Sequence, residues 1–287
     1  MPKPEMPAQA LEIEAEGARL AARFYAPQGE ARAHLVLHGA TGVPQSYYTA
    51  FAHWAAARGV GVLTYDYRDF GASQRRPLRE SDADFADWAL RDQAAAEVRL
   101  AALAPEGPLW VLGHSLGGLG FAFRQPDARV TRIVTVGAGI TRVTEHPWPF
   151  RAAALAFWYV TGPLATLIAG YLPGRRLMLG ADLPAGVYWQ WRRWCTQRRF
   201  FEVDVGKSLP APDFSRLVPA LRILTVADDV IAPPAAVRRY AEKFPAGRVR
   251  YGLLQPRAFG LKALRHIEVF SARSAAAWPA ILEPEAG

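Results

Sequence analysis

The segment GHSLG, residues 113–117, places a serine between two glycines directly after the apolar run Leu109–Leu112. A tight turn from a strand into a helix needs small residues on both sides of its central residue. A helix that we expect to start just after Ser115 would point its free backbone N–H groups towards that side chain. The five-residue pattern is common by chance, but its position after an apolar strand indicates that Ser115 is a nucleophile.

A nucleophilic serine needs a histidine base and an acid that orients this base. When the chain order is serine, acid and histidine, the base follows the last strand of the sheet, which selects His266 in LKALRHIEVF. The acid is expected just after the buried strand Leu221–Val226, where Asp228 and Asp229 follow. Asp229 is preferred because it immediately precedes the turn VIAPP, and Asp228 remains the alternative.

Acyl transfer also needs two N–H donors aimed at the developing oxyanion. The amide of Leu116, the residue after the serine, is expected to be the first donor. The second is expected from the loop HGATG, residues 38–42, with Ala40 as the donor and Thr41 as the alternative.

The other histidines are expected to have different roles. His38 is expected to order the HGATG loop, and His53 to pack within a helix. His114 is expected to point away from the neighbouring serine. For His146, a solvated loop position and a contact with substrate both stay open.

The pattern of apolar runs predicts the elements that must position these residues. A hairpin is expected over residues 11–25, and a helix over Ser46–Arg58 closed by Gly59. A long helix is expected over Asp84–Leu103. Short strands of four to seven apolar residues alternate with such helices, which predicts an α/β fold with a mostly parallel, doubly covered sheet. The remaining expected strands are His34–Leu37, Val60–Tyr65, Leu109–Leu112, Val130–Val136, Leu221–Val226 and Arg248–Leu253.

Residues 141–213 break the alternation, because no clear strand is found there. This stretch holds five of the nine tryptophans and three arginine pairs, and we expect a helical insertion that caps the carboxyl edge of the sheet. The predicted organisation is therefore residues 1–140 as the first part of the α/β core, 141–213 as the cap and 214–287 as the second part of the core.

Within the expected cap, Ala152–Gly174 is a stretch of 23 residues without a charge, long enough for a membrane span. Gly162-Pro163 lies near its middle and is expected to break a helix there. We therefore predict two short apolar helices in place of a span. A peripheral contact of the cap with a membrane surface stays open.

The composition limits the cellular locations and the partners that we expect for this protein. Cys195 is the single cysteine, so no intramolecular disulfide forms, and the first residues lack the apolar core of a signal peptide. We therefore expect a cytoplasmic protein. The net charge is +8, but the arginines are scattered and no nucleic-acid motif is present, so nucleic acid is not an expected partner. The sequence does not predict an oligomeric state.

Taken together, the motifs LVLHGATG, YDYRDFGAS, GHSLGG, TVADDVIAPP and RHIEVF resemble, in this order, the α/β-hydrolase superfamily. The resemblance covers nearly the whole chain. The stretches GYLPGRRLMLGADLPAGV and WQWRRWC, within residues 170–195, are similar to a bacterial branch of serine hydrolases that has been predicted from sequence. This resemblance implies Ser115, Asp229 and His266 as the catalytic residues, without a metal or an organic cofactor.

The sequence departs from the superfamily pattern at two positions. Asp69 stands where D-x-R-G-x-G-x-S usually has glycine, and Arg265 replaces the glycine that usually precedes the histidine. Each substitution raises the question of whether the loop beside the site is displaced.

The expected activity is that of a serine hydrolase that cleaves a carboxylic ester through an acyl-enzyme, with an apolar or lipid-like acyl group favoured by the aromatic insertion. An acyltransferase or a thioesterase would use the same residues. A binding protein without turnover is the alternative from another class, and Arg265 is the feature that favours it.

Overall fold

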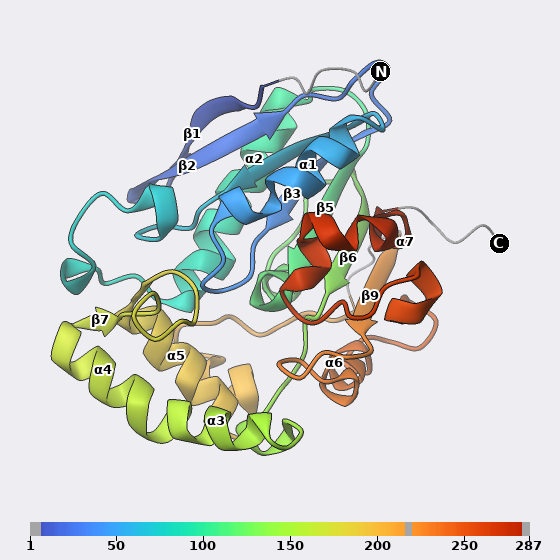
Figure 1. The fold of residues 1–287 in the computed structure, drawn as a ribbon. Helices are drawn as coiled ribbons and strands as arrows, with labels where there is room; N and C mark the ends of the chain where they lie inside the picture. Colours follow the sequence, from blue (N-terminus) through green and yellow to red (C-terminus); the bar gives the residue numbers. More distant parts are fainter. Residues whose placement is uncertain (1–6, 216–219, 283–287) are drawn as a thin grey trace.

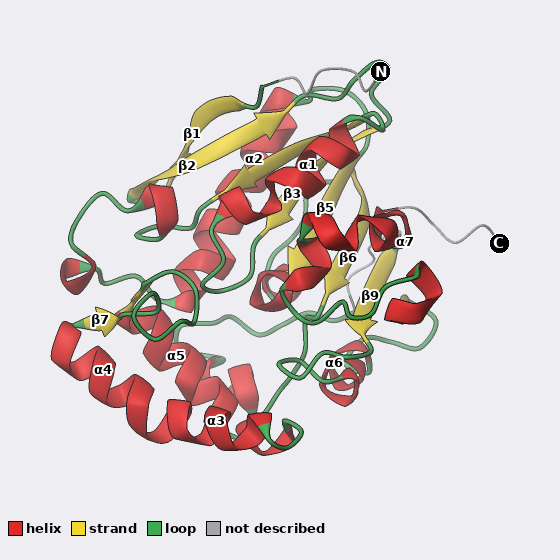
Figure 2. Cartoon of the chain, viewed as in Figure 1, coloured by secondary structure: helices red, strands yellow, loops and turns green. Residues whose placement is uncertain are grey.

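The computed structural model describes residues 7–215 and 220–282 of the chain, and its centre is an eight-stranded sheet (Figures 1 and 2). The strand order is β1-β2-β4-β3-β5-β6-β9-β10. β1 and β2 form the predicted hairpin, β2 pairs antiparallel with β4, and the remaining neighbours are parallel. The expected α/β fold with a mostly parallel sheet is confirmed. The strands are β1 Gln9–Ala15, β2 Ala18–Tyr25, β3 Ala33–His38, β4 Val60–Tyr65, β5 Leu109–His114, β6 Val130–Val136, β9 Leu221–Val226 and β10 Val249–Leu254.

Helices cover both faces of this sheet, because successive side chains of each buried strand point to opposite sides. Leu35 and Leu37 of β3 pack in the core beneath α1 (Thr49–Ala56) and α7 (Trp278–Leu282). Val36, between them, belongs to the opposite core beneath α2 (Gln93–Leu103) and α6 (Pro234–Ala241). The central strands β3, β4, β5 and β9 therefore bury both faces, which is why their sequences are mostly apolar.

The segment after Ser115 differs from the expected regular helix. It forms two short 3₁₀ turns, Ser115–Gly118 and Gly120–Phe123. Gly117, Gly118 and Gly120 lower the helix propensity of this stretch by about 1 kcal/mol each relative to alanine. Close packing explains the glycine at position 118, since a Cβ there would lie 2.8 Å from Cβ of Ala138 and 3.0 Å from Cβ of Thr135.

Between β6 and β9 the chain forms a mostly helical segment, called the insertion below, beyond the carboxyl ends of the strands (Figure 1). It contains α3 (Phe150–Ala156), α4 (Gly162–Ala169), α5 (Ala185–Thr196) and the two-residue strands β7 (Tyr171–Leu172) and β8 (Leu183–Pro184). Its core is aromatic. Trp158 and Trp194 are buried, and Trp158 stacks on Tyr188 of α5 with ring centroids 6.0 Å apart.

The predicted break at Gly162-Pro163 is wrong. α3 and α4 are joined by a π-helical turn, Phe157–Thr161, into one helix from Phe150 to Ala169. A proline inside an α-helix lacks one N–H donor and clashes with the carbonyl four residues earlier. The wider π turn ends at Thr161, two residues before Pro163, and accommodates this mismatch without ending the helix.

Candidate active site

The turn after β5 presents Ser115 at the carboxyl edge of the sheet. Ser115 is partly exposed and has a φ of 56°, in the left-handed region that non-glycine residues rarely adopt. A Cβ at Gly113 would lie 2.4 Å from Cα of Gly118, and a Cβ at Gly117 would lie 2.3 Å from the carbonyl oxygen of His38. The glycines of this motif are therefore required by close backbone contacts with the turn and with the end of β3.

The structure brings His266 and Asp229 to this serine. The Ser115 hydroxyl lies 2.8 Å from Nε2 of His266, and Nδ1 of His266 donates to Oδ2 of Asp229 at 2.6 Å. Both partners are buried. The other carboxylate oxygen of Asp229 accepts the amides of Ile231 and Ala232 at 2.8 Å each, which fixes the carboxylate. The three side chains form the hydrogen-bonded series that nucleophilic serine catalysis uses.

The alternative acid, Asp228, has a different position. Its carboxylate accepts the amides of Leu264 and Arg265 at 3.0 Å, so it holds the backbone directly before His266 and does not orient the imidazole. Arg265 adopts a φ of 50°, and Asp69, the other departure from the family pattern, has a φ of 53°. Both residues keep a left-handed backbone that glycine adopts without strain. The Arg265 side chain faces outward to Glu268, and His266 still reaches Ser115.

The two candidate oxyanion donors in the HGATG loop differ in their contacts. The Ala40 amide donates to the phenol oxygen of the buried Tyr48 at 2.8 Å, so this donor is already occupied. Within the ranges that the structure describes, no acceptor is found for the Thr41 or Leu116 amide, and the Thr41 hydroxyl is buried without a partner. Leu116 is in the first turn after β5, where amides have no intrahelical acceptor.

A hydrogen-bonded chain behind the site was not predicted from the sequence. Nε2 of His114 donates to the carbonyl oxygen of His266 at 3.0 Å, so Nδ1 is unprotonated and accepts the Tyr48 hydroxyl at 2.8 Å. Burial, together with the nearby His266, holds the pKa of His114 well below its usual value, which keeps the ring neutral. Tyr48 thereby connects the HGATG loop, the serine turn and the loop of His266.

The remaining histidines lie apart from the serine. His38 is buried beneath the HGATG loop between Tyr65 and Glu97, and its pKa is lowered by burial although Glu97 opposes the shift. His53 packs edge-on against Tyr25. His146 is buried and does not occupy a solvated loop. Its Nδ1 lies 2.9 Å from the carbonyl oxygen of Val230, directly after Asp229, so it supports the loop of the acid.

The described residues contain no group of three histidine, cysteine or carboxylate side chains that could hold a metal ion. The chemistry available at the site is that of the serine, the imidazole, the carboxylate and the backbone amides. A serine activated by a histidine and facing free amides can attack a carbonyl carbon and stabilise the resulting oxyanion.

The sheet and the position of the site at its carboxyl edge define an α/β hydrolase. The model of the alpha/beta hydrolase family matches residues 35–281, and the chain belongs to this family. No curated protein matches the sequence.

Solved structures share the fold at low sequence identity. A soluble variant of monoglyceride lipase from Saccharomyces cerevisiae, in complex with a substrate analogue, is 16% identical with a TM-score of 0.65, over 97% of this chain and 96% of the lipase. A carboxyl esterase from Bacillus coagulans is 12% identical with a TM-score of 0.56, over 87% of this chain and 90% of the esterase. A serine hydrolase without a lid from Xanthomonas campestris is 13% identical with a TM-score of 0.54, over 96% and 95%.

Proposed function

We propose that this protein is a serine hydrolase that cleaves a carboxylic ester with an apolar acyl group through an acyl-enzyme. One observation carries the proposal: the hydrogen-bonded series from Asp229 through His266 to Ser115 at the carboxyl edge of the sheet. Ligand sites of open α/β sheets lie at this edge. The likeness to a lipase and an esterase in fold is consistent with this activity.

The proposed reaction starts when the Ser115 oxygen attacks the ester carbonyl carbon while Nε2 of His266 takes the hydroxyl proton. Asp229 stabilises the imidazolium and fixes the tautomer. The tetrahedral intermediate collapses as His266 returns the proton to the leaving alcohol. His266 then removes a proton from water, which attacks the acyl-enzyme and releases the carboxylic acid and the free serine.

The oxyanion is held by the Leu116 amide and by a second donor from the HGATG loop. Ala40 can serve only when its amide leaves the phenol of Tyr48, whereas the Thr41 amide and hydroxyl are without a partner in the described structure. The geometry of the ground state therefore favours Thr41 as the second donor. Ala40 remains the alternative, because apo geometry often tightens only in the transition state.

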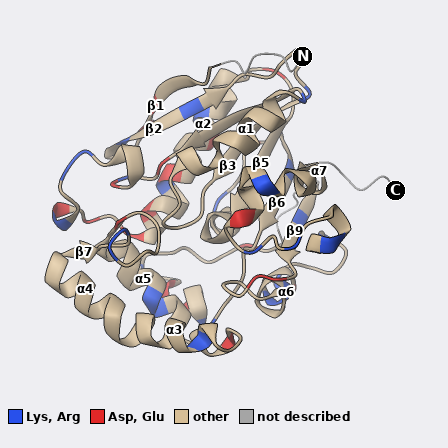
Figure 3. Cartoon of the chain, in the orientation of Figure 1, with Lys and Arg blue, Asp and Glu red and all other residues tan. Residues whose placement is uncertain are grey.

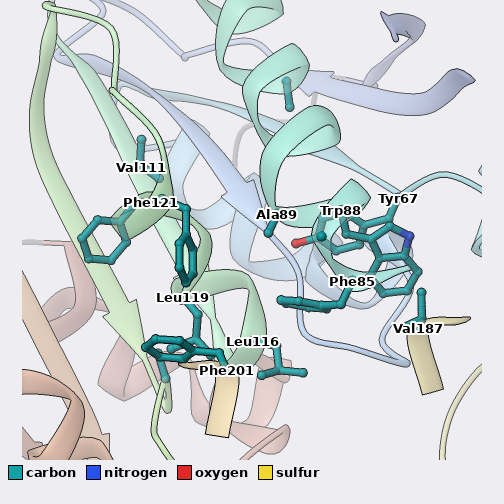
Figure 4. Close-up of a cluster of buried hydrophobic side chains, with 14 of the residues drawn as sticks. Tyr67, Phe85, Trp88, Ala89, Val111, Leu116, Leu119, Phe121, Val187 and Phe201 are labelled. Carbon is teal, nitrogen blue, oxygen red and sulfur yellow. The ribbon is translucent and has the colours of Figure 1, made fainter. Parts of the chain in front are cut away.

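Apolar side chains around the serine support an apolar acyl group. Leu116 belongs to a buried cluster that includes Leu119 of the turn, Phe85 before α2, and Val187 and Phe201 of the insertion (Figure 4). This cluster continues from the nucleophile turn into the insertion. These side chains are buried, so they make the protein interior beside the nucleophile turn apolar, and an apolar acyl group suits such surroundings.

Transfer of the acyl group to an alcohol or a thiol, or hydrolysis of a thioester, would use the same residues. The binding-protein alternative depended on a displaced histidine, and the hydrogen bond from Ser115 to His266 argues against it despite Arg265. The reaction needs no metal or organic cofactor. A cytoplasmic location stays a prediction.

The test is hydrolysis of p-nitrophenyl esters of increasing acyl length by wild type and by Ser115→Ala. We expect turnover by the wild type and a fall in kcat on the order of 10⁶-fold in the variant. Turnover that survives in Ser115→Ala, or no turnover by folded wild type at any acyl length, would contradict the proposal. Adding an alcohol acceptor and analysing the products separates hydrolysis from acyl transfer.

A further inference from the structure

The long helix of the insertion, Phe150–Ala169, is called the outer helix below. It is attached to the protein along one side only. Its buried residues recur every four positions, at Ala154, Trp158, Gly162 and Thr166. Trp158 packs on α5, stacked on Tyr188 and edge-on to Trp191. Figure 1 shows α3 and α4 at the periphery of the molecule, on the side away from the sheet.

The outer side of this helix is apolar and exposed. Tyr159, Val160, Leu164, Leu167 and Ile168 point outward, and the side chains of Leu167 and Ile168 are 71% and 85% exposed. The helix is long and apolar enough to cross a membrane by length and composition, although only 22% of its apolar window is buried in the protein. Several large apolar side chains exposed on one helix indicate a contact surface for another molecule.

The loop after the helix extends this surface towards the candidate active site. Met178 is 93% exposed, and Leu179 is also exposed. The same loop packs on the HGATG loop, where the Ala181 amide donates to the carbonyl oxygen of Gly42 at 2.9 Å. The apolar surface therefore adjoins the loop that carries the proposed oxyanion donors.

Arginines surround this apolar surface. The guanidinium of Arg192 lies 5.7 Å from the ring of exposed Tyr159, and that of Arg151 lies 6.0 Å from the ring of exposed Trp148. Arg79 contacts the helix end, since its Cβ is 3.1 Å from the ideal Cβ position of Gly170. Arg175 and Arg176 follow in the exposed loop.

These arginines are not neutralised. Residues 146–200 contain seven arginines and a single acid, Asp182. Among the described residues, Arg79, Arg151, Arg175, Arg176 and Arg192 form no ion pair. Figure 3 shows the outer helix nearly free of charge, with basic residues on the elements beside it. The surface thus combines an apolar face with an unpaired positive rim.

We propose that this face docks on an anionic lipid bilayer, with the helix lying in the plane of the interface. Apolar residues would enter the acyl boundary while the arginines contact acidic headgroups. The buried residues on α5 hold the helix against the protein, so it lies on the membrane without spanning it. A symmetric contact with a second copy would place two arginine rims opposite each other, which is unfavourable. Docking on the bilayer would bring a lipid-like ester to Ser115, and this part of the proposal rests on the proposed function.

The experiment is flotation of the full chain with vesicles of phosphatidylcholine alone or with added phosphatidylglycerol, using Ser115→Ala so that no lipid is consumed. We expect binding to the anionic vesicles and little binding to phosphatidylcholine. In the same background, Leu167→Glu with Ile168→Glu should reduce binding more than roughly tenfold, because exposed apolar contact is replaced by negative charge. Arg175→Gln with Arg176→Gln should reduce it about fivefold for each arginine.

Val98→Glu is the matched control, because Val98 on α2 is also 71% exposed but lies outside the insertion. It should bind vesicles like its parent, and circular dichroism should show that all variants are folded. Failure to float with anionic vesicles, or equal binding by the Leu167→Glu, Ile168→Glu variant, would overturn the proposal. The proposal would also be overturned if the parent protein formed a dimer that the Leu167→Glu, Ile168→Glu variant dissociates. The same substitutions are also made in the enzyme that retains Ser115, and hydrolysis of a water-soluble ester by these variants is measured. This activity tests the proposed function separately from membrane docking.

Discussion

The candidate active site and the outer helix of the insertion use their side chains in opposite ways. At the site, His266 and Asp229 are buried, and each polar atom of their series has a partner 2.6–2.8 Å away. On the outer helix, large apolar side chains such as Ile168 face solvent, and the neighbouring Arg175 and Arg176 have no ion pair among the described residues. The first region is complete within this chain, whereas the second has exposed groups that suit an external partner.

This difference shows how exactly each region must position its side chains. The proposed catalysis requires groups that are already oriented, and the chain adopts left-handed backbone at Ser115 and at Arg265, directly before His266. A membrane is a fluid partner that needs apolar area and charge but no exact geometry. We therefore expect single-atom changes to matter at the site, and only changes of charge or apolar area to matter on the outer helix.

After the loss of the serine itself, the largest effect that we expect at the site distinguishes the two adjacent acids. Asp229→Asn should lower kcat about 10⁴-fold, because the amide no longer stabilises the imidazolium and favours the wrong tautomer. Asp228→Asn keeps an oxygen acceptor for the backbone before His266, so its kcat should fall by no more than about tenfold. Steady-state kinetics on a soluble ester measures both. An equal fall in kcat in the two variants would show that the hydrogen bond to His266 does not identify the catalytic acid.

The next effect concerns the tight turn that presents the serine. Gly117→Ala should lower the free energy of unfolding by about 3 kcal/mol or more, because its Cβ would lie 2.3 Å from the His38 carbonyl oxygen. Gly107→Ala is the control, with a φ of 84° but no atom within 4 Å of the added Cβ, and it should cost only about 1 kcal/mol. Urea unfolding measures the difference. A similar cost at both positions would mean that the turn accommodates the added methyl group, and that close packing does not require glycine there.

The sequence predicted the sheet well because its strands are buried on both faces. A continuous apolar run such as Val60–Tyr65 has no competing helical period, and the structure places a strand there. The order of serine, acid and histidine along the chain was equally readable, since each follows the end of a strand, and the carboxyl ends of parallel strands share one edge. The position of Ser115, Asp229 and His266 relative to the sheet therefore followed from local patterns.

Other features depend on contacts between distant residues and had no local signal. Tyr48 connects Ala40 and His114, which is 66 residues away along the chain, and nothing near Tyr48 in the sequence indicates this. The helix across Pro163 also escaped prediction, because proline normally ends a helix and the π turn that accommodates it has no clear sequence pattern. Long-range hydrogen bonds and helix irregularities can be recognised only in the folded structure.

An intermediate effect tests whether the chain behind the site positions the catalytic groups. Tyr48→Phe removes the hydroxyl shared by the Ala40 amide and His114, so kcat should fall about tenfold with little change in KM. Tyr25→Phe is a matched control, because Tyr25 is also buried and its hydroxyl contacts Thr49 at 3.2 Å outside this chain. Both variants should lose some stability, measured by urea unfolding. If kcat is unchanged in folded Tyr48→Phe, the tyrosine has a purely structural role.

The smallest effect lies at the junction of the two regions, where the chain enters the insertion. Glu145 pairs with Arg142 of the same segment and with Arg239 of α6, both at 2.8 Å. Burial alone would raise the pKa of Glu145, but the hydrogen bonds from Arg239 and Arg142 outweigh it and lower the pKa to about 2. A carboxyl whose pKa is lower in the folded state stabilises the fold above its unfolded value, here 4.5, and loses this contribution as the pH falls towards about 2.

Glu145→Gln should therefore be less stable than wild type at neutral pH, and the difference should shrink as the pH falls through this window. Urea unfolding at a series of pH values measures it. Glu268→Gln is the control, since Glu268 pairs with Arg265 on an exposed surface and should change stability little at any pH. A constant difference between Glu145→Gln and wild type across the window would mean that the charge of Glu145 does not hold the insertion to the core. The junction would then depend on packing, as the attachment of the outer helix to α5 does.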